Sequence, residues 1–178
     1  MMPADEICRV EIFFDLYNIY AHIRNKGLKL DYLEMVNRLA EGRQITAKFV
    51  FDAYEQHGFD PSRRVHEKLR HNGFILILRP YDPNKKKQKG VDSRLTLEMY
   101  KRARDDMYDI ALMITGDGDF VPVCEDVQAL GKKVEVAAFD GMTSFELKKV
   151  ADRYHDLRTV SFPMPTKNSN YMQPEVSY

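Results

Sequence analysis

The sequence predicts an α/β protein of three layers, in which a doubly wound, mainly parallel sheet is covered by helices on both faces. Short apolar runs rich in β-branched and aromatic residues alternate with helix-length segments along the chain, which is typical of parallel strands joined by helical crossovers. The 178 residues, 44% of them hydrophobic, are enough for one domain with a sizeable core. We therefore expect one domain over residues 1–162. Residues 163–178 hold three of the eight prolines and little periodicity, so we expect a flexible tail there.

Five apolar runs are predicted as strands, and a sixth run is a weaker candidate. The five are 9–14, 45–51, 74–78, 110–114 and 134–139, and the weaker one is 159–162. Amphipathic segments with capping residues lie between them and predict helices. The helices, with the residue expected to open each, are 31–39 (Asp31), 61–70 (Asp60 as cap, Pro61 first), 92–104 (Asp92), 119–130 (Asp119 or Gly118) and 144–151 (Thr143 or Ser144). Residues 81–90 carry a proline, an asparagine and four lysines, which predicts an exposed loop.

Composition and charge exclude several classes of protein. Lys plus Arg and Asp plus Glu both total 27, so attraction to nucleic acid has to come from local patches such as the lysine run at 85–89. The two cysteines are too few for a disulfide framework and lack the spacing of a zinc site. No apolar run approaches the ~18 residues needed to span a bilayer, and the first residues lack the charge pattern of a signal peptide. We expect a cytoplasmic protein with no membrane segment and no organic cofactor.

Acidic residues follow the predicted strands at the points where ligands bind in this fold class. Asp15 and Asp117 come just past the carboxyl ends of strands, and open α/β sheets bind ligands beyond those ends. Asp119 lies across Gly118 from Asp117, and Asp92 begins a helix after the basic loop. Four carboxylates brought together could not all ionise without a divalent cation. An oxygen-rich site of this kind suits Mg²⁺ or Mn²⁺.

A structural role explains each acid when it is taken alone, because Asp and Asn are common cap and turn residues. Asp92 and Asp119 are most open to that interpretation. Asp15 and Asp117 are less so, since a carboxylate at the end of a central strand is costly without a partner. The lysine run is also compatible with an ordinary solvated loop. Tyr17, which lies between Asp15 and Asn18, is compatible with a packing role and with a role as a platform for base stacking.

The motifs together resemble the NYN domain family, in particular its LabA-like branch. The resemblance extends in order over about residues 8–160 and is carried by the segments 13–20 (FFDLYNIY), 89–95 (KGVDSRL), 114–122 (ITGDGDFVP) and 130–134 (LGKKV). It implies a PIN-like, Rossmann-type sheet with strand order 3-2-1-4-5. In that order the first and fourth strands are neighbours, so Asp15 and Asp117 would be adjacent.

The resemblance also implies an activity and a set of site residues. PIN-like domains use clustered acids with one or two divalent ions to hydrolyse RNA. The positions that match the family here are Asp15, Asn18, Asp92, Asp117 and Asp119, with Thr115 at the usual small hydroxyl position. Leu16 and Glu98 depart from the family pattern, and Glu98 ranks below the other acids because six residues on a helix turn its side chain away from Asp92.

The sequence therefore predicts a divalent-metal-dependent endoribonuclease. Asp15, Asp92 and Asp117 would hold Mg²⁺ or Mn²⁺, Asp119 would support the ion or orient the attacking water, and Asn18 would position an acid or a phosphate. Cationic side chains would attract the RNA backbone, with an affinity that weakens with salt. The expected phosphate contacts are Lys85, Lys86, Lys87, Lys89 and Arg94.

Two alternatives stay open. One is a catalytically silent module of the same fold that binds RNA or a protein partner, which includes a second copy of the chain, because fold alone does not establish activity. The other is a phosphatase of the haloacid dehalogenase type, suggested by Asp117-Gly118-Asp119. It is disfavoured because covalent aspartyl chemistry needs an activated nucleophile with suitably placed partners.

Overall fold

The computed structural model describes residues 7–25, 30–55, 60, 62–81 and 90–160. These residues form a six-stranded sheet in the order β3-β2-β1-β4-β5-β6, in which every neighbouring pair is parallel. The strands are β1 (Arg9–Asp15), β2 (Gln44–Glu55), β3 (Ile75–Tyr81), β4 (Ile110–Ile114), β5 (Lys133–Ala138) and β6 (Arg153–Asp156). The α/β class and the order 3-2-1-4-5 expected from the sequence are confirmed, and β6 extends that order by one strand.

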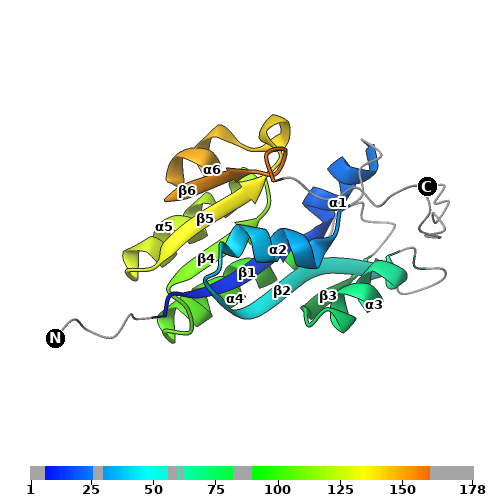
Figure 1. Cartoon of the computed structure of the whole chain (residues 1–178), viewed down its shortest axis with the longest axis horizontal. Coiled ribbons are helices and arrows are strands. Elements are labelled where there is room, and N and C mark those ends of the chain that lie inside the picture. Colours follow the sequence, from blue (N-terminus) through cyan, green and yellow to red (C-terminus); the bar gives the residue numbers. More distant parts are fainter. Residues whose placement is uncertain (1–6, 26–29, 56–59, 61, 82–89, 161–178) are drawn as a thin grey trace.

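Helices cover both faces of the sheet (Figure 1). They are α1 (Leu16–Asn25), α2 (Tyr32–Ala40), α3 (Arg63–His71), α4 (Val91–Arg104), α5 (Val121–Ala129) and α6 (Phe145–Val150). Apolar residues of α1, α2 and α3 form one core with one face of the sheet. Those of α4, α5 and α6 form a second core with the opposite face. The three layers follow from the near-continuous burial of β1, β4 and β5, which need cover on both sides.

Some helix boundaries agree with the capping residues in the sequence. The Asp31 carboxylate accepts hydrogen bonds from the N–H groups of Leu33 and Glu34, both at 3.1 Å. The Ser144 hydroxyl accepts one from the Leu147 N–H at 3.3 Å. These contacts satisfy N–H groups that the first turn of a helix leaves without partners.

Two expected boundaries are wrong. Asp92 does not cap α4, because the chain enters the helix through Gly90 at a φ of 97° and Asp92 lies in the first turn. In α3, Ser62 is the N-cap residue, and Asp60 instead accepts hydrogen bonds from the Ser62 N–H and hydroxyl. Pro61, residues 82–89 of the expected loop and the tail at 163–178 lie outside the described residues. The domain boundary at 162 stays a prediction.

The sixth strand lies earlier than the sequence suggests. Residues 157–159 form a turn in which the Thr159 N–H donates to the Asp156 carbonyl at 2.9 Å. The strand is instead the polar segment Arg153–Asp156, where His155 Nε2 lies 2.7 Å from the Glu135 carboxylate on β5. Burial would raise the pKa of Glu135, but hydrogen bonds from His155 and Arg43 lower it to about 2. This buried carboxylate supplies the partner that a polar edge strand needs.

A second buried ion pair joins the central strand to α4. Glu11 on β1 is 1% exposed, and its carboxylate accepts two hydrogen bonds of 2.5 Å from the Arg102 guanidinium. The same guanidinium lies 4.8 Å from the centre of the Phe49 ring. None of the described helices is long and apolar enough to cross a membrane.

Removing Arg102 should destabilise the fold strongly. Arg102→Ala would leave the Glu11 carboxylate buried without its partner, and breaking such a pair costs about 3–5 kcal/mol. Chemical denaturation followed by circular dichroism measures the loss. The matched control is Arg104→Ala, an exposed arginine on the same helix, for which a change within about 0.5 kcal/mol is expected. Equal effects of the two substitutions would contradict this account.

Candidate active site

The parallel pairing of β1 with β4 brings the ends of these two strands together. Phe14 is the register partner of Ile114, so the next residues along the chain, Asp15 and Thr115, meet where the strands end. The Asp15 side chain is buried, with 5% of the residue exposed. Its Oδ2 accepts a hydrogen bond from the Thr115 hydroxyl at 3.0 Å, and its Oδ1 accepts one from the Asn18 N–H at 3.3 Å. Both carboxylate oxygens therefore have fixed positions.

Thr115 links the two strand-end acids. Its hydroxyl donates to Asp15 and accepts a hydrogen bond of 3.2 Å from the Asp117 N–H. The Asp117 carboxylate then accepts one of 2.9 Å from the Asp119 N–H and caps the short 3-10 helix η1 (Gly118–Phe120). The side chain of Asp117 thus shapes the turn that carries Asp119.

Asn18 ties α1 to the same turn. Its Oδ1 accepts a hydrogen bond of 2.9 Å from the Gly116 N–H. The resemblance implied that Asn18 positions an acid or a phosphate. The contact in the structure is with the backbone that leads into Asp117, so Asn18 acts on the site by holding this turn.

The turn after β4 is pressed against the segment that leads into α6. A Cβ atom on Gly116 would lie 2.6 Å from the Met142 carbonyl oxygen, and one on Gly118 would lie 2.7 Å from the Ser144 hydroxyl. The Ser144 N–H also donates to the Gly116 carbonyl at 2.9 Å. Both positions need glycine because other backbone or side-chain atoms approach so closely. These contacts fix the path of the backbone after β4, which carries Asp117 and Asp119.

The acids at this edge influence one another electrostatically. Burial raises the pKa of Asp15 to about 7, against the lowering effect of its hydrogen bonds from Asn18 and Thr115, and the charges of Asp92 and Asp117 raise it further. The pKa of Asp92 is also raised, first by burial and then by the charges of Asp117 and Asp119. The carboxylates therefore give the site a strongly negative electrostatic potential at neutral pH.

A groove of about 470 Å³ opens beside the acids, between α4 and the segment formed by η1 and α5. Asp92 and Asp119 line it together with the exposed side chains of Leu97 and Tyr100. The other lining residues are Ser93, Thr96, Phe120, Val123 and Asp126. Sequence reasoning missed this groove, because its walls come from the packing of α4 against α5.

The four acids share one edge of the sheet without forming a closed cage. Over residues 7–25, 30–55, 60, 62–81 and 90–160, no group of three or more His, Cys, Asp or Glu side chains is close enough to hold a metal ion. The donors that are present are all carboxylate oxygens, which suit a hard cation. Mg²⁺ in particular keeps several waters and takes only one or two carboxylates. The chemistry of the donor set therefore fits such an ion, although the side chains are not gathered around one point.

Other residues singled out in the sequence lie elsewhere. Glu98 is not among the residues lining the groove, and its carboxylate lies 3.9 Å from the Arg94 guanidinium. Lys85, Lys86, Lys87 and Lys89 fall outside the described residues. Of the two interpretations of Tyr17, the packing role is wrong, because 58% of the residue is exposed. Its place on α1 lies away from the buried stripe of Leu16 and Ile19, and that spacing is visible in the sequence.

Comparison with known proteins gives a family and a fold. The family model described as the NYN domain matches residues 9–158. The chain is 24% identical to the low amplitude and bright protein LabA of Synechococcus elongatus over 163 residues, which is 85% of each protein. It is also similar to the crystal structure of a protein of unknown function from Vibrio parahaemolyticus, with a TM-score of 0.74 and 24% identity over 88% of this chain and 96% of the other.

The raised pKa of Asp15 predicts a dependence of stability on pH. Below about pH 4 the carboxyl is protonated in both the folded and the unfolded chain. Between about pH 4 and 7 the unfolded chain loses this proton and the folded chain keeps it, so stability falls as the pH rises. A rise from 3.8 to about 7 corresponds to about 4 kcal/mol. Asp15→Asn, which removes the ionisation, should therefore be more stable than the native chain at pH 8, by about 2–4 kcal/mol.

Denaturation with EDTA present, at a series of pH values, measures this difference. It should shrink toward zero as the pH falls from 7 to 4. The control is Asp105→Asn, which changes an exposed carboxylate whose pKa is lowered by its hydrogen bond with Arg104. A native chain whose stability relative to Asp15→Asn is the same at all these pH values would contradict the assigned environment of Asp15.

Proposed function

The chain belongs to the NYN domain family, whose members share a PIN-like nuclease fold, and on that premise we propose that it is a metal-dependent ribonuclease. The proposal rests above all on Asp15, a buried carboxylate at the junction of β1 and β4 whose pKa is raised to about 7. Perturbed carboxyl groups of this kind are concentrated at functional sites. Here burial and two neighbouring acids together raise the pKa of the Asp15 carboxyl. This group lies at the sheet edge where doubly wound folds bind ligands.

Mg²⁺ or Mn²⁺ would be held by Asp15, Asp92 and Asp117. When bound, such an ion supplies a hydroxide nucleophile at neutral pH and stabilises negative charge on the phosphate oxygens. The carboxylates of these residues would in turn be stabilised by the positive charge, which offsets the cost of burying Asp15 among other acids.

The chain's own side chains supply the positioning. Thr115 and Asn18 hold Asp15 and the Asp117 turn in place through the hydrogen bonds already described. Asp92 faces the groove, where its carboxylate would help to hold the ion. Asp119, exposed at the opposite wall, would orient the attacking water.

RNA as the substrate follows from the family, and the groove is consistent with it. Tyr100 offers a partly exposed aromatic ring in the groove that Asp92 and Asp119 also line, and such rings stack on bases of single strands. Arg94 and the lysines of 85–89 remain proposed phosphate contacts. We also retain the cytoplasm as the proposed compartment.

One observation favours a second candidate, a module that binds RNA or a protein without cleaving. Among the described residues the acids do not form a ready-made metal site, and a binding module would not need one. The match to the NYN domain argues against the phosphatase interpretation, which belongs to a different fold family.

Cleavage of RNA is the test of the leading proposal. Single-stranded and structured RNAs are incubated with the native chain in Mn²⁺, in Mg²⁺ and in EDTA, and products are separated on denaturing gels. We expect product only with a divalent ion. Asp15→Asn combined with Asp117→Asn should lower the rate at least about 100-fold, because two proposed metal ligands lose their charge.

The matched control is Asp105→Asn combined with Glu125→Gln, which removes the same charge from exposed acids that neither line the groove nor are proposed ligands. Its rate should stay close to that of the native chain. RNA binding that persists in EDTA with no product under any condition would replace the nuclease with the binding module. Equal rates for the native chain and the Asp15, Asp117 variant would exclude the proposed site.

A further inference from the structure

The outer surface of α3 is strongly basic, although the whole chain carries equal numbers of basic and acidic residues. Its exposed residues include Arg63, Arg64, Lys68, Arg70 and His71, which we call the α3 cationic face. At 100° per residue these five side chains fall within an arc of about 160°. The inward side of the helix is formed by the buried residues His66 and Leu69. Glu67 is the one acidic residue of the helix.

Two of the five cations on this face are placed against the local preference of a helix, whereas Lys68, Arg70 and His71 lie in the last turn, where cations are favoured. Arg63 and Arg64 lie in the first turn, which contains no acidic residue, and the dipole of a helix disfavours cations at that end. Arg63 pairs with Glu67 at 3.1 Å but is itself 78% exposed. Among the described residues, Arg64 and Arg70 have no ion pair or hydrogen bond from their guanidinium groups. Arg64 thus departs from the local preference of the helix and has no compensating contact among the described residues, as is expected where a residue serves binding.

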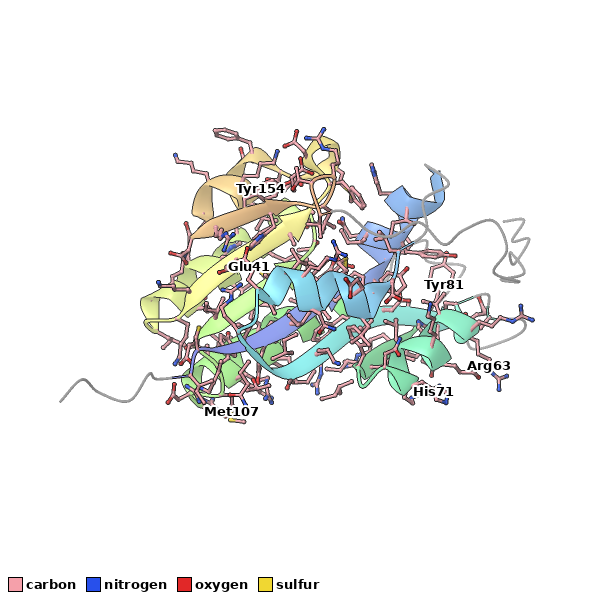
Figure 2. All side chains as sticks on the ribbon, in the orientation of Figure 1. Glu41, Arg63, His71, Tyr81, Met107 and Tyr154 are labelled. Atoms are coloured by element: carbon pink, nitrogen blue, oxygen red, sulfur yellow. The ribbon has the colours of Figure 1, made fainter. Side chains whose placement is uncertain are left out.

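The α3 cationic face begins at the same edge of the sheet as the acids. The chain leaves the carboxyl end of β2 and enters α3, so the amino end of this helix lies toward the edge where β1 and β4 also end (Figure 1). Strand β3, against which α3 packs, is two strand spacings from β1, or about 10 Å. In Figure 2, Arg63 and His71 lie on the outer surface of the helix, directed away from the sheet.

The acidic edge and the α3 cationic face act on a nucleic acid in opposite ways: one repels its phosphates and the other attracts them. The acidic edge repels phosphates, because its carboxylates are negatively charged; the charges of Asp92 and Asp117 already raise the pKa of Asp15. A nuclease with such a site needs cations elsewhere to retain the strand. A helix of nine residues is about 13 Å long, which is enough for contact with roughly three phosphates.

We propose that the α3 cationic face binds the phosphate backbone of the RNA, outside the cleavage site and without regard to sequence. This inference rests on the proposed function for the identity of the nucleic acid. The contact is electrostatic, so it contributes to affinity and to the position of the strand. It takes no part in the chemical step.

The test is RNA binding measured by fluorescence anisotropy, in EDTA, as a function of salt. The test variant is R63Q/R64Q/R70Q. At low salt we expect it to bind a labelled single-stranded RNA at least about tenfold more weakly than the native chain. The slope of log affinity against log salt should fall in magnitude by about 2 to 3, one for each lost phosphate contact.

The matched control is K101Q/R104Q/K149Q, which removes the same charge from exposed positions on α4 and α6. It should keep the native slope, and circular dichroism should show that both triple variants are folded. If the test variant and the control bind RNA alike, or if the native chain binds no RNA, the inference is overturned. The inference is also overturned if the test variant loses binding to anionic lipid vesicles while its binding to RNA is unchanged.

The same variants separate this inference from the proposed nuclease. Cleavage that is metal-dependent in the native chain, combined with binding that does not depend on α3, would overturn the inference and leave the nuclease in place. If RNA binding depends on α3 but the chain never cleaves RNA, the inference stands and the proposed nuclease is overturned.

Discussion

A single carboxylate, that of Asp15, is the constraint around which this edge of the molecule is organised. It ends the central strand, where both faces of the sheet are covered and water has little access. A charge in that position is costly, and two hydrogen bonds only partly offset the cost, as the raised pKa of the group indicates. The fold tolerates this cost because β1 and β4 are adjacent and Thr115 reaches Asp15 directly. A divalent cation at this edge would remove most of the penalty.

The other acids depend on how the backbone after β4 is held. Asn18 binds it from α1, and the segment before α6 approaches it so closely that Gly116 and Gly118 cannot carry side chains. Three parts of the chain, from the beginning, the middle and the end of the domain, thus determine where Asp117 and Asp119 lie. Asp92 arrives separately, on the first turn of α4, across the groove from Asp119. This arrangement gives the site one rigid side and one side that depends on the packing of α4.

Much of this arrangement could be predicted from the sequence, and the reasons are physical. Strand β4 is a short, continuous apolar run and β1 is largely apolar, so the ends of these strands, and the acids there, are visible without a structure. Strand β6 could not be found this way, because Arg153–Asp156 is polar and becomes a strand only through its pairing with β5 and the buried Glu135. The close approach of Met142 to Gly116 was equally hidden, since it joins segments far apart in the chain. The groove that Tyr100 lines depends on how α4 packs against η1 and α5, which spacing within one helix does not reveal.

The central claim is that Asp15, Asp92 and Asp117 form one metal site, completed by waters and phosphate. The most direct measurement is anomalous diffraction from crystals of the native chain grown with Mn²⁺. The account predicts a peak at the carboxyl ends of β1 and β4, about 2.0–2.2 Å from carboxylate oxygens of Asp15 and at least one of the other two acids. Saturating Mn²⁺ with no peak at this edge, and with these side chains as far apart as they are here, would contradict it.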